Sequence, residues 1–467
     1  MADDVTLLSA NELLSLYRMK KLSPVEVTQA TLDRIASLDQ RLNGFCLVDS
    51  DAALAAAKAS EARWHKGQPT GLLDGVPSAI KDLILTKGWP TLRGSLTISR
   101  DQSWDEDAPC VARLREHGAV FLGKTTTPEF GWKGVTDSPL TGITRNPWNP
   151  DVTPGGSSGG SASAIATGMG ALAIGTDGGG SIRIPSGFTG VYGIKPSFGR
   201  VPAAPLSPFG TVAHVGPMTR TVTDAALMLT VIAEPDDRDW HALPYEARDY
   251  RIGLEQGVKG LRMAFSPDLG YVSVDREVAE IVADAAQVFS ELGADVEEVN
   301  PGFPNPWDCF TKHWFAGAAN LVHPFTPEQR AKLDPGLQEV VAQGESIALA
   351  DYMQAVNERG ALGQYMKRFH QDYDLLLTPT LPIPAFTAGQ EVPDAMKEQR
   401  WPTWTPFTFP FNLTQQPAAS VPCGRTKAGL PVGLQIVGPN HNDALVLRAS
   451  RAFESTRSIE LPDLSVL

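Results

Sequence analysis

Short apolar segments with the character of buried strands alternate with helical segments along this chain of 467 residues. Strands are expected at about 119–123, 171–176, 261–265, 294–299, 374–378 and 419–421, with a further strand ending near Lys81. Helices are expected at about 51–64, 109–117, 161–167, 275–292 and 443–454. Because strands interleaved with helices fold into layers, the pattern predicts an α/β fold with a largely parallel or mixed sheet.

The chain begins with helix signals. Ser9 is followed three residues later by Glu12, and Ser23 by Glu26, and both pairs are capping boxes. Pro24 also occupies the first position of the second helix, where proline is favoured. The start of the chain is therefore expected to be helical.

Charge and composition narrow the classes of partner. The formal net charge is −13 and no run of Lys or Arg forms a basic tract, so nucleic acid and anionic membranes are not expected as partners. The four cysteines have neither a disulfide nor a zinc spacing: Cys46, Cys110, Cys309 and Cys423. With no signal segment and no apolar run of membrane-spanning length, a soluble cytoplasmic protein is expected.

The segment 154–185, PGGSSGGSASAIATGMGALAIGTDGGGSIRIP, holds two serines among glycines, Ser157 and Ser181. A serine attacks a carbonyl only with the help of a base, and the charge that develops needs N–H donors aimed at it. Three glycines come directly before Ser181 and leave the main-chain amides open to a close approach. The segment therefore predicts a site for acyl transfer.

Lys81 lies in an apolar frame, GVPSAIKDLIL. Burying an ammonium group is costly unless the group is neutral or paired. One interpretation is a structural ion pair with Asp82 or another neighbour. In the presence of the two serine loops, we favour the other, a buried lysine whose lowered pKa lets the neutral amine act as a base.

These motifs together resemble the amidase signature family of serine hydrolases, and among them the stand-alone bacterial-type amidases. The resemblance rests on GGSSGGS, on GTDGGGSIRIPS and on the upstream Lys-Asp pair, and it extends to 435–439 near the C-terminus. It implies a single α/β/α sandwich around a mixed, largely parallel β-sheet. One domain over 1–467 is then expected, with core motifs at 70–220 and a variable, aromatic-rich region at about 300–415 that supplies either pocket walls or peripheral packing.

The resemblance also implies a role for each motif residue. Lys81 would be the base, Ser157 the proton shuttle with a cis peptide bond to the preceding glycine, and Ser181 the nucleophile. Ser158 is the competitor for the role of Ser157. The expected oxyanion-hole amides are those of Gly178, Gly179, Gly180 and Ser181, with Ser158, Thr176, Asp177 and Arg183 as supporting residues and Phe130 and Gly131 beside the substrate. Family members often carry a larger residue where this chain has Gly178.

The expected activity is hydrolysis of a carboxylic amide, and the same geometry would also serve an ester or a carbamate. The alternative is the glutaminase subunit of a tRNA-dependent amidotransferase, which shares the triad. The segment 124–131, KTTTPEFG, favours a stand-alone amidase, because the amidotransferase subunits usually show a Met-Asp-Glu-Phe type sequence there. No cofactor or metal is expected, since the eight histidines lack a metal-binding spacing. The expected partner is a small-molecule amide, and the expected state a monomer or homodimer.

Overall fold

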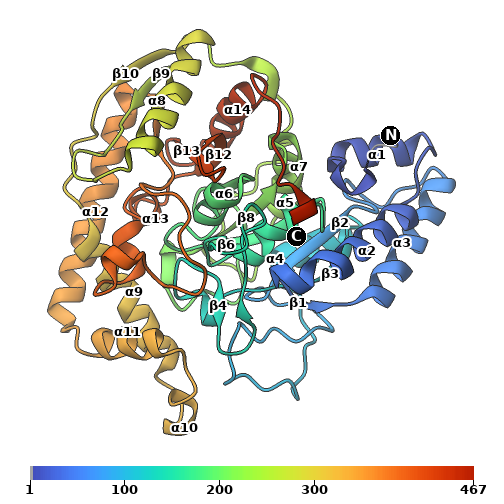
Figure 1. Ribbon diagram of the computed structural model, residues 1–467, viewed down its shortest axis with the longest axis horizontal. Coiled ribbons are helices and arrows are strands. Elements are labelled where there is room, and N and C mark those ends of the chain that lie inside the picture. The colour runs from blue at the N-terminus through green and yellow to red at the C-terminus, as the bar shows by residue number, and fades with distance from the viewer. Residues whose placement is uncertain (1–3, 467) are drawn as a thin grey trace.

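A mixed sheet of eleven strands runs through the computed structural model, which describes residues 4–466 (Figure 1). The strands in spatial order are β1 (Phe45–Val48), β3 (Val120–Thr125), β2 (Pro77–Lys81), β6 (Leu172–Asp177), β8 (His214–Thr219), β7 (Tyr192–Lys195), β12 (Ala418–Arg425), β13 (Pro431–Val437), β11 (Leu375–Pro379), β9 (Arg262–Phe265) and β10 (Asp295–Glu298). A separate two-stranded ribbon joins β4 (Asp137–Ser138) to β5 (Gly142–Ile143).

Parallel pairing lies on either side of an antiparallel centre of this sheet, and at one edge β1 pairs antiparallel with β3. β3, β2 and β6 are parallel neighbours on one flank, and β11, β9 and β10 on the other. From β6 through β8, β7, β12 and β13 to β11, neighbouring strands are antiparallel. The predicted mixed sheet is therefore confirmed, with its parallel pairing on the two flanks.

Helices cover both faces of the sheet. They are α1 (Ala10–Arg18), α2 (Pro24–Leu42), α3 (Ser50–His65), α4 (Pro109–Glu116), α5 (Gly159–Ala166), α6 (Arg183–Thr189), α7 (Val222–Ile232), α8 (Arg276–Glu291), α9 (Trp307–Val322), α10 (Pro327–Arg330), α11 (Pro335–Glu345), α12 (Leu349–Asp372), α13 (Pro410–Leu413) and α14 (Asp443–Glu454). α4, α7, α8 and α14 contribute to one core, and α5 and α6 pack on the other face.

Strand alternation explains the two cores. Ile80 and Ile174 point into the core under α7, while their neighbours Ala79 and Ala173 point into the core under α5. A period of two places successive side chains on opposite faces of a sheet, so strands buried on both faces are apolar throughout. This is why these segments are recognisable as short continuous apolar runs.

The N-terminal helices begin where the sequence predicts. Ser9 and Glu12 cap α1 reciprocally, and Ser23 and Glu26 do the same at α2. Each box satisfies amide hydrogens that the first turn of a helix leaves without partners. Figure 1 shows α1, α2 and α3 together at one end of the molecule, far from α9, α11 and α12.

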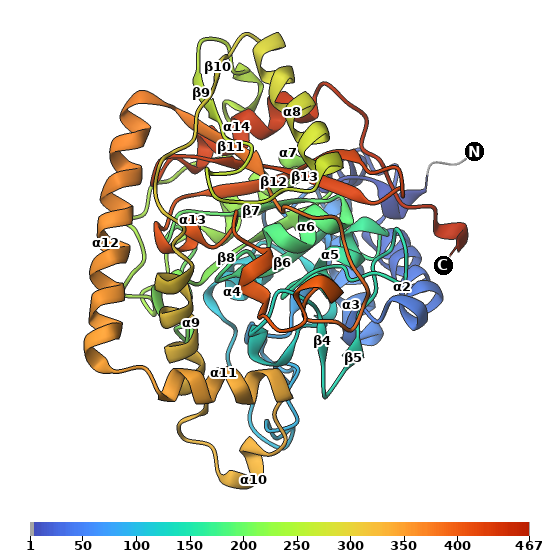
Figure 2. The ribbon, with the colours of Figure 1, turned by 60° about the vertical axis from the view of Figure 1, so that its left-hand side comes forward.

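The region at 300–415 is more regular than its sequence suggests. It forms α9, α11 and the 24-residue helix α12; α9 and α12 lie side by side at one end of the sheet, and α11 crosses below them (Figure 2). The apolar period of α12 is blurred because it buries only Ala355, Leu362 and Met366, while Leu349 is exposed. The aromatic side chains of this region form a second core with α6.

Candidate active site

The motif residues meet where parallel strands β2 and β6 end and helices α5 and α6 begin. Lys81 is the last residue of β2, and Thr176 and Asp177 end β6. Ser157 lies just before α5, and Ser181 lies in the loop that joins β6 to α6. Loops at the carboxyl ends of parallel strands commonly form binding sites in α/β proteins.

The Lys81 amine is fully buried among hydroxyl groups. Its Nζ lies 2.7 Å from Ser157 Oγ, 2.8 Å from Ser158 Oγ and 2.8 Å from Thr176 Oγ1. Burial lowers the pKa of Lys81 well below its ordinary value, although the charge of Asp177 opposes that shift. The lowered pKa, caused by burial, favours a neutral amine that can accept a proton.

The hydrogen bonds separate Ser157 from its competitor. Ser158 Oγ donates to the Thr176 carbonyl at 3.2 Å and accepts from the Thr176 amide at 3.3 Å. Its hydroxyl hydrogen is therefore committed to the backbone of β6. The hydroxyl of Ser157 remains free to donate to Lys81, and the Gly156–Ser157 peptide bond is cis, as the resemblance implied.

Asp82 does not pair with Lys81. Its carboxylate turns toward Lys124 of β3, with Oδ1 3.6 Å from that Nζ. Lys124 also donates to the Ile84 carbonyl at 2.6 Å and to Thr91 Oγ1 at 2.8 Å. The ion-pair interpretation of Lys81 with Asp82 is therefore wrong for this structure, because consecutive residues turn to opposite sides.

The loop before Ser181 uses one of its predicted oxyanion donors elsewhere. The Gly180 amide donates to Asp177 Oδ1 at 2.8 Å, so its hydrogen is already engaged within the loop. In residues 4–466, the amides of Gly178, Gly179 and Ser181 donate to no other protein group. These three amides remain the candidate donors.

A buried ion pair braces the loop. Arg183 Nε lies 3.0 Å from Asp177 Oδ2 and its Nη2 lies 2.9 Å from Oδ1. Burial alone raises the pKa of Asp177, but the charge and hydrogen bonds of Arg183 outweigh burial and hold that pKa well below its usual range. Asp177 therefore stays ionised and holds the Gly180 amide in place.

Three residues far along the sequence complete this brace. Asn412 Nδ2 donates to Asp177 Oδ1 at 2.8 Å, and Arg183 Nη1 donates to Gln435 Oε1 at 2.7 Å and to the Thr408 carbonyl at 2.9 Å. None of these three residues was expected in the site from the sequence. A signal was available for Gln435 alone, since a fully buried amide in the apolar strand β13 needs hydrogen-bond partners.

Aromatic rings pack against the glycine loop that precedes Ser181. A Cβ added to Gly178 would lie 2.7 Å from Trp314 Cζ3, and one added to Gly179 would lie 2.6 Å from Trp401 Cη2 and 2.7 Å from Phe310 Cζ. These distances are below any real contact, so the glycines are required by packing. The aromatic region 300–415 thus contacts the loop that carries Ser181.

Gly131 adjoins Ser157, and Phe130 opens onto a cleft. A Cβ added to Gly131 would lie 3.2 Å from Ser157 Oγ. Phe130 lines a cleft of about 640 Å³, together with Arg93, Leu321 and Phe325 and much of the loop 97–106. Phe130 and Phe325 have ring centroids 5.9 Å apart. The two residues expected beside the substrate therefore lie between Ser157 and this cleft.

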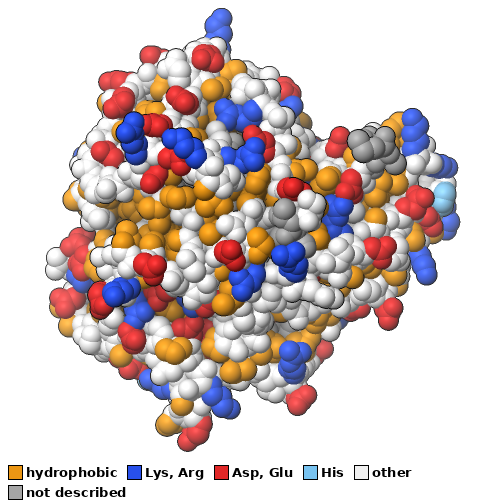
Figure 3. Space-filling view, in the orientation of Figure 1, with side chains coloured by type: hydrophobic (Ala, Val, Ile, Leu, Met, Phe, Trp, Pro, Cys, Tyr) orange, Lys and Arg blue, Asp and Glu red, His pale blue; other side chains and the backbone are white. Residues whose placement is uncertain are grey.

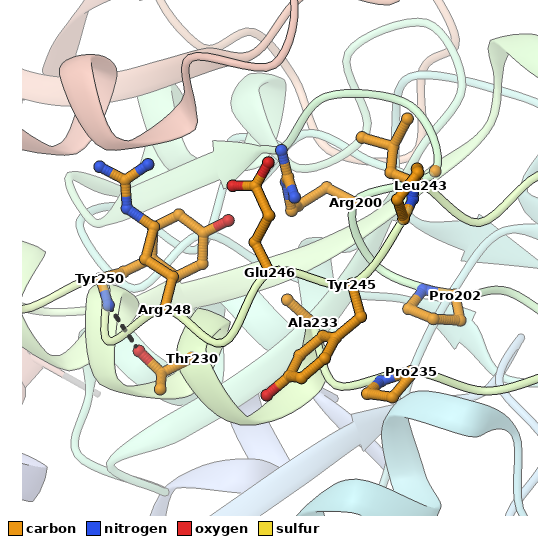
Figure 4. Close-up of a pocket in the computed structure, with 12 residues that line it drawn as sticks. Arg200, Pro202, Thr230, Ala233, Pro235, Leu243, Tyr245, Glu246, Arg248 and Tyr250 are labelled. Atoms are coloured by element: carbon orange, nitrogen blue, oxygen red, sulfur yellow. Dashed lines mark hydrogen bonds between the residues drawn. The ribbon is translucent and has the colours of Figure 1, made fainter.

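Another depression lies elsewhere, in the loop 233–250. Arg200, Tyr245, Glu246 and Arg248 line it with Tyr250, whose amide donates to Thr230 Oγ1 at 2.9 Å (Figure 4). Its volume is only about 10 Å³, which is too small for more than a water molecule. It contains none of the motif residues.

On the face shown in Figure 3, acidic and basic side chains are interspersed and gather into no single-sign patch. Within residues 4–466, no helix is both long and apolar enough to cross a membrane. The same residues contain no group of three or more His, Cys, Asp or Glu placed to hold a metal ion.

Comparison with known proteins identifies relatives over nearly the whole chain. The family profile described as Amidase matches residues 26–447. An acylamidase from Rhodococcus erythropolis is 39% identical, covering 96% of this chain and 95% of that protein. One subunit of the glutamyl-tRNA(Gln) amidotransferase of Myxococcus xanthus (strain DK1622) is 37% identical, covering 97% of each chain.

Solved structures agree with these sequence matches. A bacterial aryl acylamidase belonging to the amidase signature (AS) enzymes superposes with a TM-score of 0.90 at 33% identity, over 96% of each chain. A 6-aminohexanoate cyclic dimer hydrolase complexed with substrate gives a TM-score of 0.88 at 27% identity, over 98% of this chain and 99% of the other. The fold, a mixed sheet with helices on both faces, and the relatives that share it define the chain as a hydrolase. The chain belongs to the amidase signature family.

Proposed function

We propose that this protein hydrolyses a carboxylic amide through an acyl-enzyme on Ser181. The observation that carries the proposal is the buried Lys81 amine, 2.7 Å from Ser157 Oγ, with a pKa held well below its ordinary value. Neutral Lys81 takes a proton from Ser157 as Ser157 takes the proton of Ser181. The freed Ser181 oxygen then attacks the amide carbon.

The rest of the cycle uses the same groups. The amides of Gly178, Gly179 and Ser181 hold the oxyanion, and the proton stored on Lys81 passes through Ser157 to the leaving nitrogen as the C–N bond breaks. Water then attacks the Ser181 ester, which releases the acid and restores the serine hydroxyl. An ester or a carbamate would be cleaved by the same steps.

The relatives favour an acylamidase. The protein from Rhodococcus erythropolis carries that name, and the aryl acylamidase structure has a TM-score of 0.90. We therefore place acyl and aryl amides first among the substrates to test. The expected organisation is a single domain that works without a cofactor.

A second candidate is the glutaminase component of an amidotransferase, which the 37% identity to the Myxococcus xanthus amidotransferase chain favours. A stand-alone amidase purifies alone and leaves free glutamine intact. A glutaminase releases ammonia from glutamine and co-purifies with partner subunits from its native cell extract. Glutamine turnover together with such partners would replace the first proposal by the second.

The direct test is a hydrolysis screen over aliphatic amides, aryl amides, carbamates and esters with the wild-type protein and Ser181→Ala. Ser181→Ala should lose covalent labelling by a fluorophosphonate and lower kcat/KM at least ~10³-fold. Its thermal unfolding midpoint should match that of the wild type, because the hydroxyl of Ser181 makes no hydrogen bond within residues 4–466. Undiminished labelling of this variant would place the nucleophile elsewhere.

A further inference from the structure

The cleft beside Phe130 contains a cation for which residues 4–466 supply no hydrogen-bond or salt-bridge partner. Arg93 lines this cleft and is half-buried, and within that range its guanidinium forms neither kind of contact. The opposing charge that acts on it is Asp82, whose carboxylate is already 3.6 Å from Lys124. A desolvated guanidinium that lacks a partner is costly, so a ligand that supplies one gains binding energy there.

The backbone holds Arg93 in an unusual conformation. Arg93 and Gly94 have φ of 56° and 63°, and Phe130 and Gly131 have φ of 53° and 72°. The left-handed region is costly for a residue with a side chain, and such residues cluster at binding and catalytic sites. Two such pairs therefore stand side by side, and in each pair the non-glycine residue lines the cleft.

These two turns are locked to one another and to Ser157. The Phe130 amide donates to the Arg93 carbonyl at 2.8 Å. A Cβ added to Gly94 would lie 2.6 Å from the Thr127 carbonyl oxygen, while one added to Gly131 would reach Ser157 Oγ at 3.2 Å. These close backbone contacts fix the position of Arg93 relative to the Ser157 hydroxyl.

We propose that Arg93 is a specificity residue that binds a carboxylate carried by the substrate, while Phe130 and Phe325 hold the apolar or aryl body that connects this carboxylate to the scissile amide. The inference rests on the proposed hydrolase function and names a substrate class for it. A planar guanidinium matches a carboxylate with two parallel hydrogen bonds, and an aromatic wall selects the apolar part between the two ends.

The acidic residues of the cleft do not fill this role themselves. Asp105 and Glu106 also line it, but both are exposed, and in the described part of the chain neither forms a salt bridge with Arg93. They leave the half-buried guanidinium available to a substrate anion. Because exposed charges are screened by solvent, they weaken the attraction for such an anion without cancelling it.

The test compares matched substrates that differ in one charge. One pair is the 4-carboxyanilide and the 4-methylanilide of the same acid, which carry the substituent on the amine side. The other pair is the monoamide of terephthalic acid and 4-methylbenzamide, which carry it on the acyl side. The measured quantity is the ratio of kcat/KM for the charged member to that for the neutral member, so intrinsic reactivity cancels when protein variants are compared.

Two variants of Arg93 are suited to this test. Arg93→Asn removes the charge and tolerates positive φ, and Arg93→Lys keeps the charge without the planar fork. Arg93→Asn should lower the charged-to-neutral ratio of kcat/KM at least tenfold in one substrate pair, because KM for the charged member rises. The ratio for Arg93→Lys should lie between those of the wild type and Arg93→Asn. The control is Arg100→Asn, which makes the same change of net charge at an exposed position outside the cleft lining and should leave the ratio unchanged.

The outcomes separate this inference from the function on which it rests. If neutral amides are hydrolysed and Arg93→Asn leaves both ratios unchanged, or lowers both members of a pair equally, Arg93 does not select a carboxylate and the inference is wrong. If the wild type hydrolyses no amide and no fluorophosphonate labels Ser181, the proposed function itself fails. A tenfold loss confined to the charged members supports both.

Discussion

The number of hydrogens around the Lys81 amine indicates which hydroxyl groups can donate a proton to it in the proposed mechanism. A neutral amine has two hydrogens and one lone pair, yet three hydroxyl oxygens lie within 2.8 Å of it. One of those hydroxyls must therefore donate to the nitrogen. Since Ser158 already donates to the backbone of β6, the donor is Ser157 or Thr176, and of these two Ser157 is the proton shuttle of the proposed mechanism.

This arrangement predicts how activity depends on pH. Burial lowers the pKa of Lys81, so the fraction of neutral amine, and with it kcat/KM, should rise with pH through an ionisation well below the ordinary lysine value of about 10.4 and then level off. Lys81→Met keeps the apolar bulk but removes the base. Fluorophosphonate labelling of this variant should be slow, and its rate should lose the rise with pH.

The comparison of the wild type with Lys81→Met is needed because Lys124 is a second buried lysine with a lowered pKa. Burial also lowers the pKa of Lys124, to about 8, against the charge of Asp82. If the pH dependence survives in Lys81→Met, Lys124 or another group titrates in its place and Lys81 is not the base. Lys81→Arg should not restore activity, because a guanidinium stays protonated.

The two neighbouring serines allow a paired test of the shuttle. Ser157→Ala should lower kcat/KM by ~10²–10⁴-fold, the usual contribution of a group that transfers a proton in the transition state. Ser158→Ala removes hydrogen bonds to Thr176 and Lys81 and should cost about tenfold or less, since one such bond contributes about 1 kcal/mol. Equal losses in both variants, measured by steady-state kinetics, would contradict the assignment.

The sequence singled out the residues to which we assign the chemistry and missed those that hold their loop in place. Lys81, Ser157 and Ser181 lie in short motifs that can be recognised locally. Asn412 reaches Asp177 across 235 positions of sequence, so no local pattern reveals that contact. Nor does any local pattern reveal that the Gly180 amide is engaged by Asp177, because the turn geometry decides it.

At the scale of elements, the parallel flanks were easier to predict than the middle of the sheet. β2, β3 and β6 were expected from their short apolar runs, although β2 ends in Lys81 and β3 contains Lys124. β7, β8 and β13 were not among the expected strands, because β7 has only four residues and β8 and β13 contain both glycine and proline. Short strands and strands interrupted by glycine and proline lack the local apolar pattern from which a strand is predicted.

The crossing of α9 and α11 depends on a glycine of α11, and a substitution of this glycine tests how closely the two helices pack. Gly344 of α11 lies so close to α9 that an added Cβ would overlap the Phe315 carbonyl. Gly344→Ala should therefore push the helices apart and lower the free energy of unfolding by about 1–3 kcal/mol. Chemical denaturation monitored by tryptophan fluorescence measures this change.

A glycine in α12 provides the control. No atom lies within 4 Å of a Cβ added to Gly360, which sits in the helix interior with ordinary helical geometry. Gly360→Ala should leave activity unchanged and raise stability by up to about 1 kcal/mol, because alanine loses less entropy in a helix. Destabilisation by both substitutions would show that the α9–α11 crossing has no special sensitivity.

At the scale of the whole molecule, the start of the chain is tied to its middle. Asp224 of α7 accepts hydrogen bonds from the Ala10 amide at 2.9 Å and from the Asn11 amide at 3.1 Å. Arg220 donates to the Leu8 carbonyl at 2.9 Å and to the Gly170 carbonyl at 2.8 Å. The first helix is thus fastened beside the helix and loop that precede β6.

Removing this fastening should loosen the N-terminal end without touching the chemistry. Asp224→Ala leaves the first amides of α1 without a partner and should cost about 1–3 kcal/mol of stability. Hydrogen exchange in residues 10–18 should accelerate while kcat falls by less than about twofold. Asp33→Ala, at an exposed position of α2, is the matched control, and an equal response of both variants would contradict the anchoring role.

The contact between Gly178 and Trp314 constrains how the sequence of this enzyme can change. Trp314 is nearly fully buried, stacks on Phe209 with ring centroids 3.9 Å apart and donates its indole hydrogen to the Trp132 carbonyl, so the ring cannot move aside. A larger residue at 178 is tolerated only after 314 has become smaller. The two positions are therefore epistatic, and a path from this chain to a variant with a bulky residue at 178 has a fixed order of steps.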